Sequence, residues 1–250
     1  MIRRGLGVLL AALALSACGG ESGGPGGADG TAELWITHDR GTEVVLTATV
    51  PAGQTVLQAL KAAADVETRY GGRFVEAVNG VEGSLVGQRD WFYFLNGIEP
   101  DIGAAEVTLR PGDIAWWDFR SWKGEARAEP VVVGAFPEPF LHGWGGERRR
   151  LEVRAPPFLA PEADALRNVL GGEEANPLDE EPNVFLLRIE PGSGATLTAE
   201  REAGNDSPVT FTLAGSLQAV RFAALNLAAS PRIVRFRFTA RFDATGEVVG

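Results

Sequence analysis

Two aromatic runs constrain the fold of this chain more than any other feature of its sequence. The first is Trp91 to Gly97 (WFYFLNG) and the second is Pro111 to Phe119 (PGDIAWWDF). Side chains alternate across a strand, so each run would place large apolar groups on both of its faces. Asn-Gly closes the first run and Gly-Asp opens the second, and both pairs favour turns. The pattern predicts paired strands that other parts of the protein cover on both faces.

The N-terminus predicts export. Arg3 and Arg4 precede an apolar stretch, Gly5 to Leu15, whose length is typical of a secretory signal and too short for a stable bilayer span. The tetrapeptide ending at Cys18 (LSAC) resembles the lipobox of bacterial lipoproteins, which implies removal of residues 1–17 and acylation of Cys18. An ordinary cleaved secretory peptide is the alternative. The resemblance predicts a lipid anchor on the outer face of the bacterial cytoplasmic membrane, or on the periplasmic face of the envelope.

The segment after this signal predicts a tether. Cys18 is the only cysteine, so no intramolecular disulfide and no thiolate metal cluster can form. Residues 18–30 are Gly-rich and bury too little apolar surface to fold, which predicts a flexible linker. The formal net charge is −10, and it becomes more negative once Arg3 and Arg4 are removed. This charge argues against nucleic acid as a partner.

Residues 31–122 predict an α+β domain of the β-grasp type. β-forming residues on both sides of Asp39-Arg40-Gly41 predict a hairpin. Thr55 and Gln58 have the spacing of a capping box, and the apolar residues that follow them form a helical stripe. A strand at Phe74–Val78 and the two aromatic strands complete the order hairpin, helix, then three strands.

The same segment carries a family resemblance. The motifs TVLQALKAAA, FVEAVNGVEG, WFYFLNG and LRPGDIAWWDF occur in order across roughly residues 45–120. Together they resemble the bacterial domain that is related to the C-terminal domain of transcobalamin and intrinsic factor. The resemblance implies a small β-grasp-like domain on an exported lipoprotein, with Trp91 to Leu95 near a corrinoid. The vertebrate carriers also have a large helical domain, and nothing in this sequence resembles it.

Residues 129–250 predict a second α+β domain of unknown role, with a boundary in the polar segment 121–130. Its C-terminal part alternates apolar residues with arginines, which predicts a strand over Val234 to Phe242. The other expected elements are strands at Val131–Gly134 and Leu151–Arg154, a helix at Pro161–Leu170, an acidic loop at Glu173–Pro182, a hairpin from Asn183–Ile189 and Ala195–Ala199, and a helix capped by Ser216.

Motifs of catalysis are absent from the sequence. It contains no nucleophile elbow, zinc-binding histidine pair, phosphate loop or dinucleotide fingerprint, so we expect neither an enzyme nor a cofactor. His38 and His142 are the only histidines and predict no metal site, although a histidine such as His142 could ligate a corrinoid cobalt. A packing contact between domains is the alternative for His142. Arg235, Arg237 and Arg241 form either an anion site or a solvated face balanced by acids.

The candidate binding residues come from the aromatic strands and their ends. We expect a flat ligand to stack on indole and phenol rings, with Asn96 or Asp118 orienting it. Packing inside the core is the alternative for each ring. Two functions remain open: non-catalytic binding of a ligand such as cobalamin or another corrinoid for an uptake transporter, or an interaction module for another envelope protein. The candidate residues are Trp91, Tyr93, Asn96, Trp117, Asp118 and Trp122.

Overall fold

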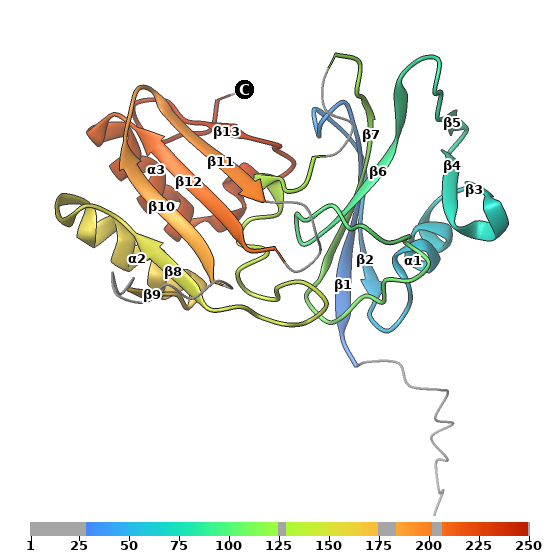
Figure 1. Ribbon diagram of the computed structural model, residues 1–250, viewed down its shortest axis with the longest axis horizontal. Helices are drawn as coiled ribbons and strands as arrows, with labels where there is room; N and C mark the ends of the chain where they lie inside the picture. The colour runs from blue at the N-terminus through green and yellow to red at the C-terminus, as the bar shows by residue number, and fades with distance from the viewer. Residues whose placement is uncertain (1–28, 125–128, 175–183, 202–206, 250) are drawn as a thin grey trace, which may run out of the picture.

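The protein has an α+β fold, as the sequence predicts, and its strands form three sheets. The computed structural model describes residues 29–124, 129–174, 184–201 and 207–249 (Figure 1). Within these residues lie a 4-stranded, a 3-stranded and a 6-stranded sheet. The first two belong to the N-terminal half of the chain and the third to the C-terminal half.

The 4-stranded sheet contains both aromatic runs. Its order is β2-β1-β7-β6, formed by β1 (Thr31–His38), β2 (Glu43–Pro51), β6 (Arg89–Leu95) and β7 (Ile114–Ser121). β1 and β2 form the predicted antiparallel hairpin, and β7 runs parallel to β1. β6 and β7 pair antiparallel and place Tyr93 opposite Trp117. The predicted pairing of the aromatic strands is therefore confirmed.

The helix α1 (Val56–Ala63) packs on one face of this sheet. The side chain of Thr55 accepts from the Gln58 amide at 3.1 Å, and the Gln58 side chain accepts from the Thr55 amide at 2.8 Å, so the capping box is confirmed. Trp117 lies on this face beside Leu57. Trp116 lies on the opposite face and is fully buried beside Phe238. Both faces of the aromatic strands are therefore covered.

A small antiparallel sheet follows α1 in the chain. Its order is β3-β4-β5, with β3 (Val66–Arg69), β4 (Phe74–Val78) and β5 (Val81–Glu82). Only β4 was expected from the sequence. β3 (VETR) is polar and alternates between exposed and half-buried positions, and β5 has two residues, so neither carries a strong apolar pattern. A short 3₁₀ turn, η1 (Tyr70–Gly72), joins β3 to β4.

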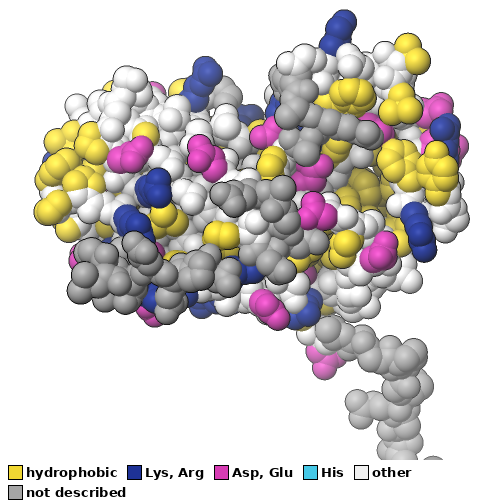
Figure 2. Space-filling view, in the orientation of Figure 1, with side chains coloured by type: hydrophobic (Ala, Val, Ile, Leu, Met, Phe, Trp, Pro, Cys, Tyr) yellow, Lys and Arg dark blue, Asp and Glu magenta, His cyan; other side chains and the backbone are white. Residues whose placement is uncertain are grey.

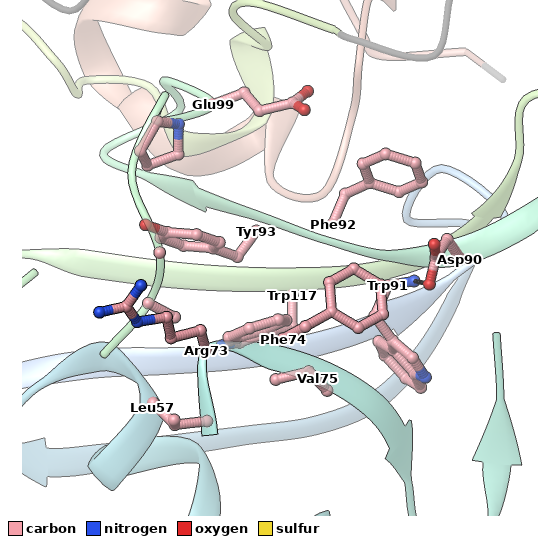
Figure 3. Close-up of a pocket in the computed structure, with 13 residues that line it drawn as sticks. Leu57, Arg73, Phe74, Val75, Asp90, Trp91, Phe92, Tyr93, Glu99 and Trp117 are labelled. Carbon is pink, nitrogen blue, oxygen red and sulfur yellow. Dashed lines mark hydrogen bonds between the residues drawn. The ribbon is translucent and has the colours of Figure 1, made fainter. Parts of the chain in front are cut away.

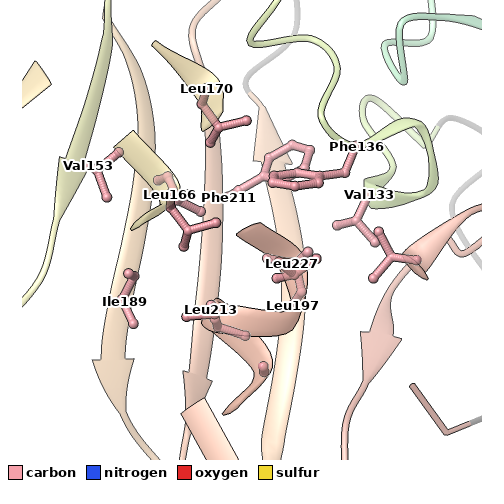
Figure 4. Close-up of a cluster of buried hydrophobic side chains, with 14 of the residues drawn as sticks. Val133, Phe136, Val153, Leu166, Leu170, Ile189, Leu197, Phe211, Leu213 and Leu227 are labelled. Atoms are coloured by element: carbon pink, nitrogen blue, oxygen red, sulfur yellow. The ribbon is translucent and has the colours of Figure 1, made fainter. Parts of the chain in front are cut away.

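The C-terminal half packs helices against one face of the 6-stranded sheet. Every second residue of β12 is buried, which marks a strand with one covered face. Helices α2 and α3 contribute Leu166, Leu170 and Leu227 to the core beneath it (Figure 4). The sheet order is β13-β11-β12-β10-β8-β9, and the elements are β8 (Leu151–Arg154), β9 (Glu173–Glu174), β10 (Phe185–Pro191), β11 (Ala195–Arg201), β12 (Val209–Gly215), β13 (Ala240–Arg241), α2 (Ala160–Leu170) and α3 (Leu217–Ala229).

Three predictions for this half were wrong. β10 and β11 are not paired as a hairpin, because β12 lies between them, parallel to β10 and antiparallel to β11. Val234 to Phe242 is not a long strand. Its first part belongs to the 3₁₀ turn η4 (Pro231–Val234), and Phe236 has a positive φ of 65°, which breaks the strand before β13. In the segment at Val131–Gly134, Val131 forms an isolated β-bridge with Ile98, and the last two residues belong to the 3₁₀ turn η2 (Val133–Ala135), so the segment is not a strand.

Other expectations for this half are met. Leu151–Arg154 forms β8, and the helix expected from Pro161 begins one residue earlier. The Ser216 side chain caps α3 by accepting from the Ala219 amide. Another 3₁₀ turn, η3 (Pro157–Leu159), leads into α2. Glu173 and Glu174 of the expected acidic loop form β9, so that part of the prediction was wrong, and residues 175–183 of the expected loop and hairpin lie outside the described residues. The boundary between domains 31–122 and 129–250 stays a prediction.

Candidate functional site

A cavity of about 330 Å³ opens beside the edge of β6 (Figure 3). We call it the aromatic cleft. Its walls come from β6, β7, the start of β4, the helix α1 and the loop that follows β6. The lining residues are Leu57, Arg73, Phe74, Val75, Asp90, Trp91, Phe92, Tyr93, Glu99, Pro100, Gly103, Ala104 and Trp117. Pockets for small ligands in proteins start at about this size.

Stacked rings form one wall of the aromatic cleft. The rings of Tyr93 and Trp117 lie 5.1 Å apart between centroids, with 28° between their planes. The Tyr93 hydroxyl donates to the Ile102 carbonyl at 2.6 Å, and Trp91 Nε1 donates to the Val81 carbonyl at 2.8 Å. Trp117 Nε1 is buried and has no hydrogen-bond partner in the described part of the chain. Leaving a buried donor unpaired costs about 1–3 kcal/mol.

The charged groups of the aromatic cleft are mostly acidic. Glu99 accepts from the Glu129 amide at 2.7 Å and from Arg120 Nη2 at 3.3 Å. Burial raises the pKa of Glu99, and the hydrogen bond from Glu129 and the charge of Arg120 oppose that rise. Burial also raises the pKa of Tyr93, which stays a neutral hydrogen-bond donor. Arg73 is exposed at the mouth and has no ion pair within the described ranges.

Exposed apolar side chains lie near the cleft without lining it. Tyr70 is 81% exposed, Leu85 70% and Val86 99%. A second hollow of about 280 Å³ adjoins the cleft, with Phe74 and Asp90 lining both. Figure 2 shows hydrophobic side chains around a hollow on the side of the molecule that holds the small sheet. Large contiguous patches of exposed apolar surface are rare on monomeric proteins and mark binding sites.

Three of the predicted binding residues line the aromatic cleft, namely Trp91, Tyr93 and Trp117. Their side chains meet because the odd residues of β6 and β7 share the face toward α1. Trp122 does not line it. The Trp122 amide donates to the Gln88 carbonyl at 2.9 Å and extends the pairing of β6 with β7.

Asn96 and Asp118 lie away from the cleft and are fully buried. Asn96 Nδ2 donates to Asp113 Oδ1 at 2.8 Å and to the Gly143 carbonyl at 2.9 Å, and Asn96 Oδ1 accepts from the Ile114 amide. These bonds hold the turn after β6 against the start of β7.

Asp118 fixes the hairpin loop between β1 and β2. Its Oδ1 accepts from the Thr37 hydroxyl at 2.6 Å and from the Gly41 amide at 3.0 Å, and its Oδ2 accepts from the Arg40 amide. The structure gives Asn96 and Asp118 these internal contacts in place of the ligand contacts expected of them. Ligand binding by the other candidates stays a prediction, and Cys18 lies outside the described residues.

Other residues of the cleft had no sequence signal. Leu57 and Ala104 read as ordinary core positions, and Arg73 and Glu99 as ordinary surface charges. Phe74 is the exception, since an aromatic residue at the start of a strand could have been tested against the aromatic runs. Its tertiary position depends on η1 and the small sheet, which the sequence did not predict.

The two histidines and Arg235, the remaining candidate residues, each contact a glutamate carboxylate. His142 Nδ1 lies 2.6 Å from Oε1 of the buried Glu138, and His38 Nδ1 lies 3.2 Å from Glu43 Oε2. Arg235 contacts Glu33 at 3.2 Å and lies over the Trp35 ring, so it is not part of an arginine ladder on a strand. In the described part of the chain, no three His, Cys, Asp or Glu residues form a metal-binding group. No helix there is long and apolar enough to cross a membrane.

The cleft lies inside the part of the chain that matches a known family. Residues 53–121 match the family described as Domain of unknown function (DUF4430). This match runs from just before α1 to the end of β7 and includes every residue that lines the aromatic cleft. No curated protein matches the chain.

Two solved structures share a weak likeness with this chain. One is described as "a putative metal binding protein from Ruminococcus gnavus ATCC 29149", with 16% identity and a TM-score of 0.31 over 37% of this chain and 98% of that one. The other is haptocorrin in complex with Cbi, with 16% identity and a TM-score of 0.30 over 36% of this chain and 25% of that one. Scores this low do not establish a common fold.

Proposed function

We propose that this protein is an extracytoplasmic lipoprotein that binds a ligand non-catalytically in the aromatic cleft. The observation that carries the proposal is the stack of Tyr93 on Trp117 in the wall of the cleft. The stack offers an apolar ring surface inside a pocket, as is typical of ligand sites. The absence of recognisable catalytic motifs in the sequence supports binding without chemistry.

The finer form of the proposal is capture of cobalamin or another corrinoid for an uptake transporter. It is supported by the motif resemblance over roughly residues 45–120. The cleft, at about 330 Å³, is at the small end of ligand pockets and suits one flat or apolar group. A corrinoid would therefore contact the protein through part of its surface and leave the rest for a second protein.

The second candidate function is binding of another envelope protein. The exposed residues Tyr70, Leu85 and Val86 near the cleft favour it, because a small ligand in the cleft would leave them in water. Both functions place the ligand at Trp117, so one pair of variants serves both.

Binding is tested by tryptophan fluorescence and calorimetry of the purified protein with cobinamide, cobalamin and the flat apolar probe anilinonaphthalene sulfonate. Trp117→Phe is the test variant and Trp122→Phe the matched control, since both exchange indole for phenyl but only Trp117 lines the cleft. We expect Trp117→Phe to weaken binding about 10-fold through loss of ring area, and Trp122→Phe to change it little. Saturable binding that Trp117→Phe leaves unchanged would contradict the site, and absence of any isotherm would remove these ligands.

Export and anchoring are tested separately. In a bacterial host that processes lipoproteins, the wild-type chain should incorporate labelled fatty acid and fractionate with membranes. Cys18→Ser should lose both properties while keeping its cleft. Equal membrane fractionation of Cys18→Ser would contradict the lipid anchor.

A further inference from the structure

The strand β6 is an edge strand whose outer side faces the aromatic cleft. It pairs with β7 on one side only, and no other strand pairs with it among the described residues. Its residues Asp90 to Tyr93 line the cleft. An exposed edge of this kind offers main-chain donors and acceptors to an incoming extended segment.

The pairing pattern shows which groups of β6 are available. The Asn96 amide donates to the Ile114 carbonyl, and the Trp122 amide donates to the Gln88 carbonyl. In an antiparallel pair hydrogen-bonded residues recur every second position, so the even-numbered residues of β6 bond to β7. The main-chain groups of the odd-numbered residues point to the outer edge.

Most outer groups at the two ends of β6 are already bonded. Arg89 exchanges hydrogen bonds with Ser84, and Leu95 exchanges hydrogen bonds with Ile98. The Trp91 amide donates to Asp90 Oδ1 at 3.0 Å. The Trp91 carbonyl and both main-chain groups of Tyr93 have no partner within the described ranges. The unbonded stretch therefore coincides with the part of β6 that forms the cleft wall.

The opposite wall of the cleft is also incompletely paired. β5 pairs only with Ala77 and Val78 of β4, and it leaves Phe74 and Val75 without a strand on that side. Phe74 and Val75 line the cleft across from β6 (Figure 3). The cleft thus separates the last strand of the 4-stranded sheet from an unpaired part of the 3-stranded sheet.

We propose that the ligand of the aromatic cleft is an extended peptide segment that adds to β6 as a fifth strand. This inference rests on the proposed function of the cleft and names its ligand class. The peptide residue opposite Tyr93 would donate to the Tyr93 carbonyl and accept from the Tyr93 amide, and a later amide would donate to the Trp91 carbonyl. Cross-strand neighbours share a face, so the side chain of that residue points toward Trp117 and Leu57.

The charged residues of the cleft and the exposed apolar residues near it define the peptide further. Asp90 and Glu99 line the cleft and the charge of Glu106 acts on Tyr93, whereas Arg73 is the one cation among the lining residues. The chain carries a net charge of −10. The surface therefore favours a peptide with one large apolar side chain at the centre and basic side chains on either side. Exposed apolar residues in and beside the cleft, such as Phe74 and Tyr70, extend the contact beyond the central residue.

The test uses synthetic peptides of about seven residues, the length of an ordinary strand, with Phe, Trp, Leu or Val at the centre and Lys at alternate positions. Each peptide has a twin that is N-methylated on the amides facing the protein, and a second twin with Glu in place of Lys. Affinity is measured by calorimetry with the full purified protein. Hydrogen exchange of the Tyr93 amide is followed by NMR with selective nitrogen-15 labelling of tyrosine, which is well resolved because the chain has only 2 tyrosines.

The expected result is saturable binding of a Lys-containing peptide, about 10-fold weaker binding of its N-methylated twin, and slower exchange of the Tyr93 amide in the complex. The Glu twin should bind more weakly than the Lys peptide, and the difference between them should shrink at high salt. Equal binding of the N-methylated twin would overturn strand addition while leaving the cleft a binding site. Failure of every peptide, with the planar probes still bound, would overturn the peptide class alone, and failure of peptides and probes together would remove the proposed function as well.

Discussion

Tyr93 and Trp117 stack across two paired strands, with their ring centroids 5.1 Å apart, and the Tyr93 hydroxyl ties this stack to the Ile102 carbonyl at 2.6 Å. The hydrogen bond joins the wall of the aromatic cleft to the loop that closes one end of it. The position of the ring and the position of the loop are therefore linked through one hydroxyl group.

Tyr93→Phe should loosen this loop without removing the ring stack. We expect the free energy of unfolding to fall by about 1 kcal/mol, the usual net value of one hydrogen bond. Urea denaturation followed by tryptophan fluorescence measures the change. Tyr70→Phe is the matched control, because Tyr70 is 81% exposed and its hydroxyl has no hydrogen-bond partner to lose within the described chain. Equal midpoints for wild type and Tyr93→Phe would show that the bond to Ile102 contributes no stability.

Alanine variants at two glycines with the same φ distinguish the cost of backbone strain from the cost of a steric clash. Gly41 and Gly80 both have a φ of 77°, so alanine is strained at either position. A Cβ at Gly41 would collide with the Phe236 carbonyl oxygen, whereas a Cβ at Gly80 would meet nothing within 4 Å. We expect Gly80→Ala to cost about 1 kcal/mol and Gly41→Ala several times as much, because the hairpin loop must move away from Phe236. Similar losses in thermal denaturation would contradict a tight contact between Gly41 and Phe236.

The elements that the sequence predicted well are those with strong local signals. The capping box at Thr55 and Gln58 formed as expected, and the alternation of the aromatic runs placed Trp116 and Trp117 on opposite faces. The predictions that failed did so because tertiary packing overrode the local sequence pattern. Phe236 alternates with arginines as a strand residue would, but its ring packs 4.9 Å from Trp35 and so covers the 4-stranded sheet.

The candidate site was predictable in its rings and not in its polar groups. Trp91, Tyr93 and Trp117 meet because strand periodicity dictates their common face. Asn96 and Asp118 flank these rings in sequence, but turns draw their side chains into internal hydrogen bonds. The alternation of side chains along a strand does not show which polar groups will form hydrogen bonds within turns.

The pH dependence of stability should reflect buried carboxyl groups. Burial raises the pKa of Asp113 and of Asp118 above the ordinary value of 3.8, and that of Glu99 and Glu138 above 4.5. A group whose pKa is higher in the folded state binds protons more readily when folded, so its stabilising contribution is largest below the unfolded pKa. The free energy of unfolding should therefore decline as the pH rises from the ordinary carboxyl pKa through the raised values.

Urea denaturation at pH steps upward from about 4 measures this decline. Asp118→Asn should flatten it, since the amide cannot ionise, even though the variant is less stable overall through lost hydrogen bonds to the Gly41 and Arg40 amides. An unchanged slope for Asp118→Asn would assign the pH dependence to the other carboxyl groups.

The last prediction concerns Arg120, a buried cation behind the aromatic cleft. Its guanidinium lies 3.8 Å from the centroid of the Phe92 ring, and Arg120 Nη2 lies 3.3 Å from Glu99 Oε2. The Arg120 side chain is 1% exposed, so its loss leaves a partly buried carboxylate without its cation. We expect Arg120→Met to cost about 3–5 kcal/mol. Arg69→Met is the matched control and should cost less than about 1 kcal/mol, because the Arg69 side chain is more than half exposed in its ion pairs.

A double variant separates the charge from the packing of Arg120. In Arg120→Met with Glu99→Gln the uncompensated carboxylate is gone, so part of the lost stability should return, and the midpoint in urea should lie above that of Arg120→Met alone. A double variant no more stable than Arg120→Met would show that Arg120 does not act through Glu99, which leaves its contacts with the Phe92 and Phe94 rings and the charges of Asp118 and Glu129.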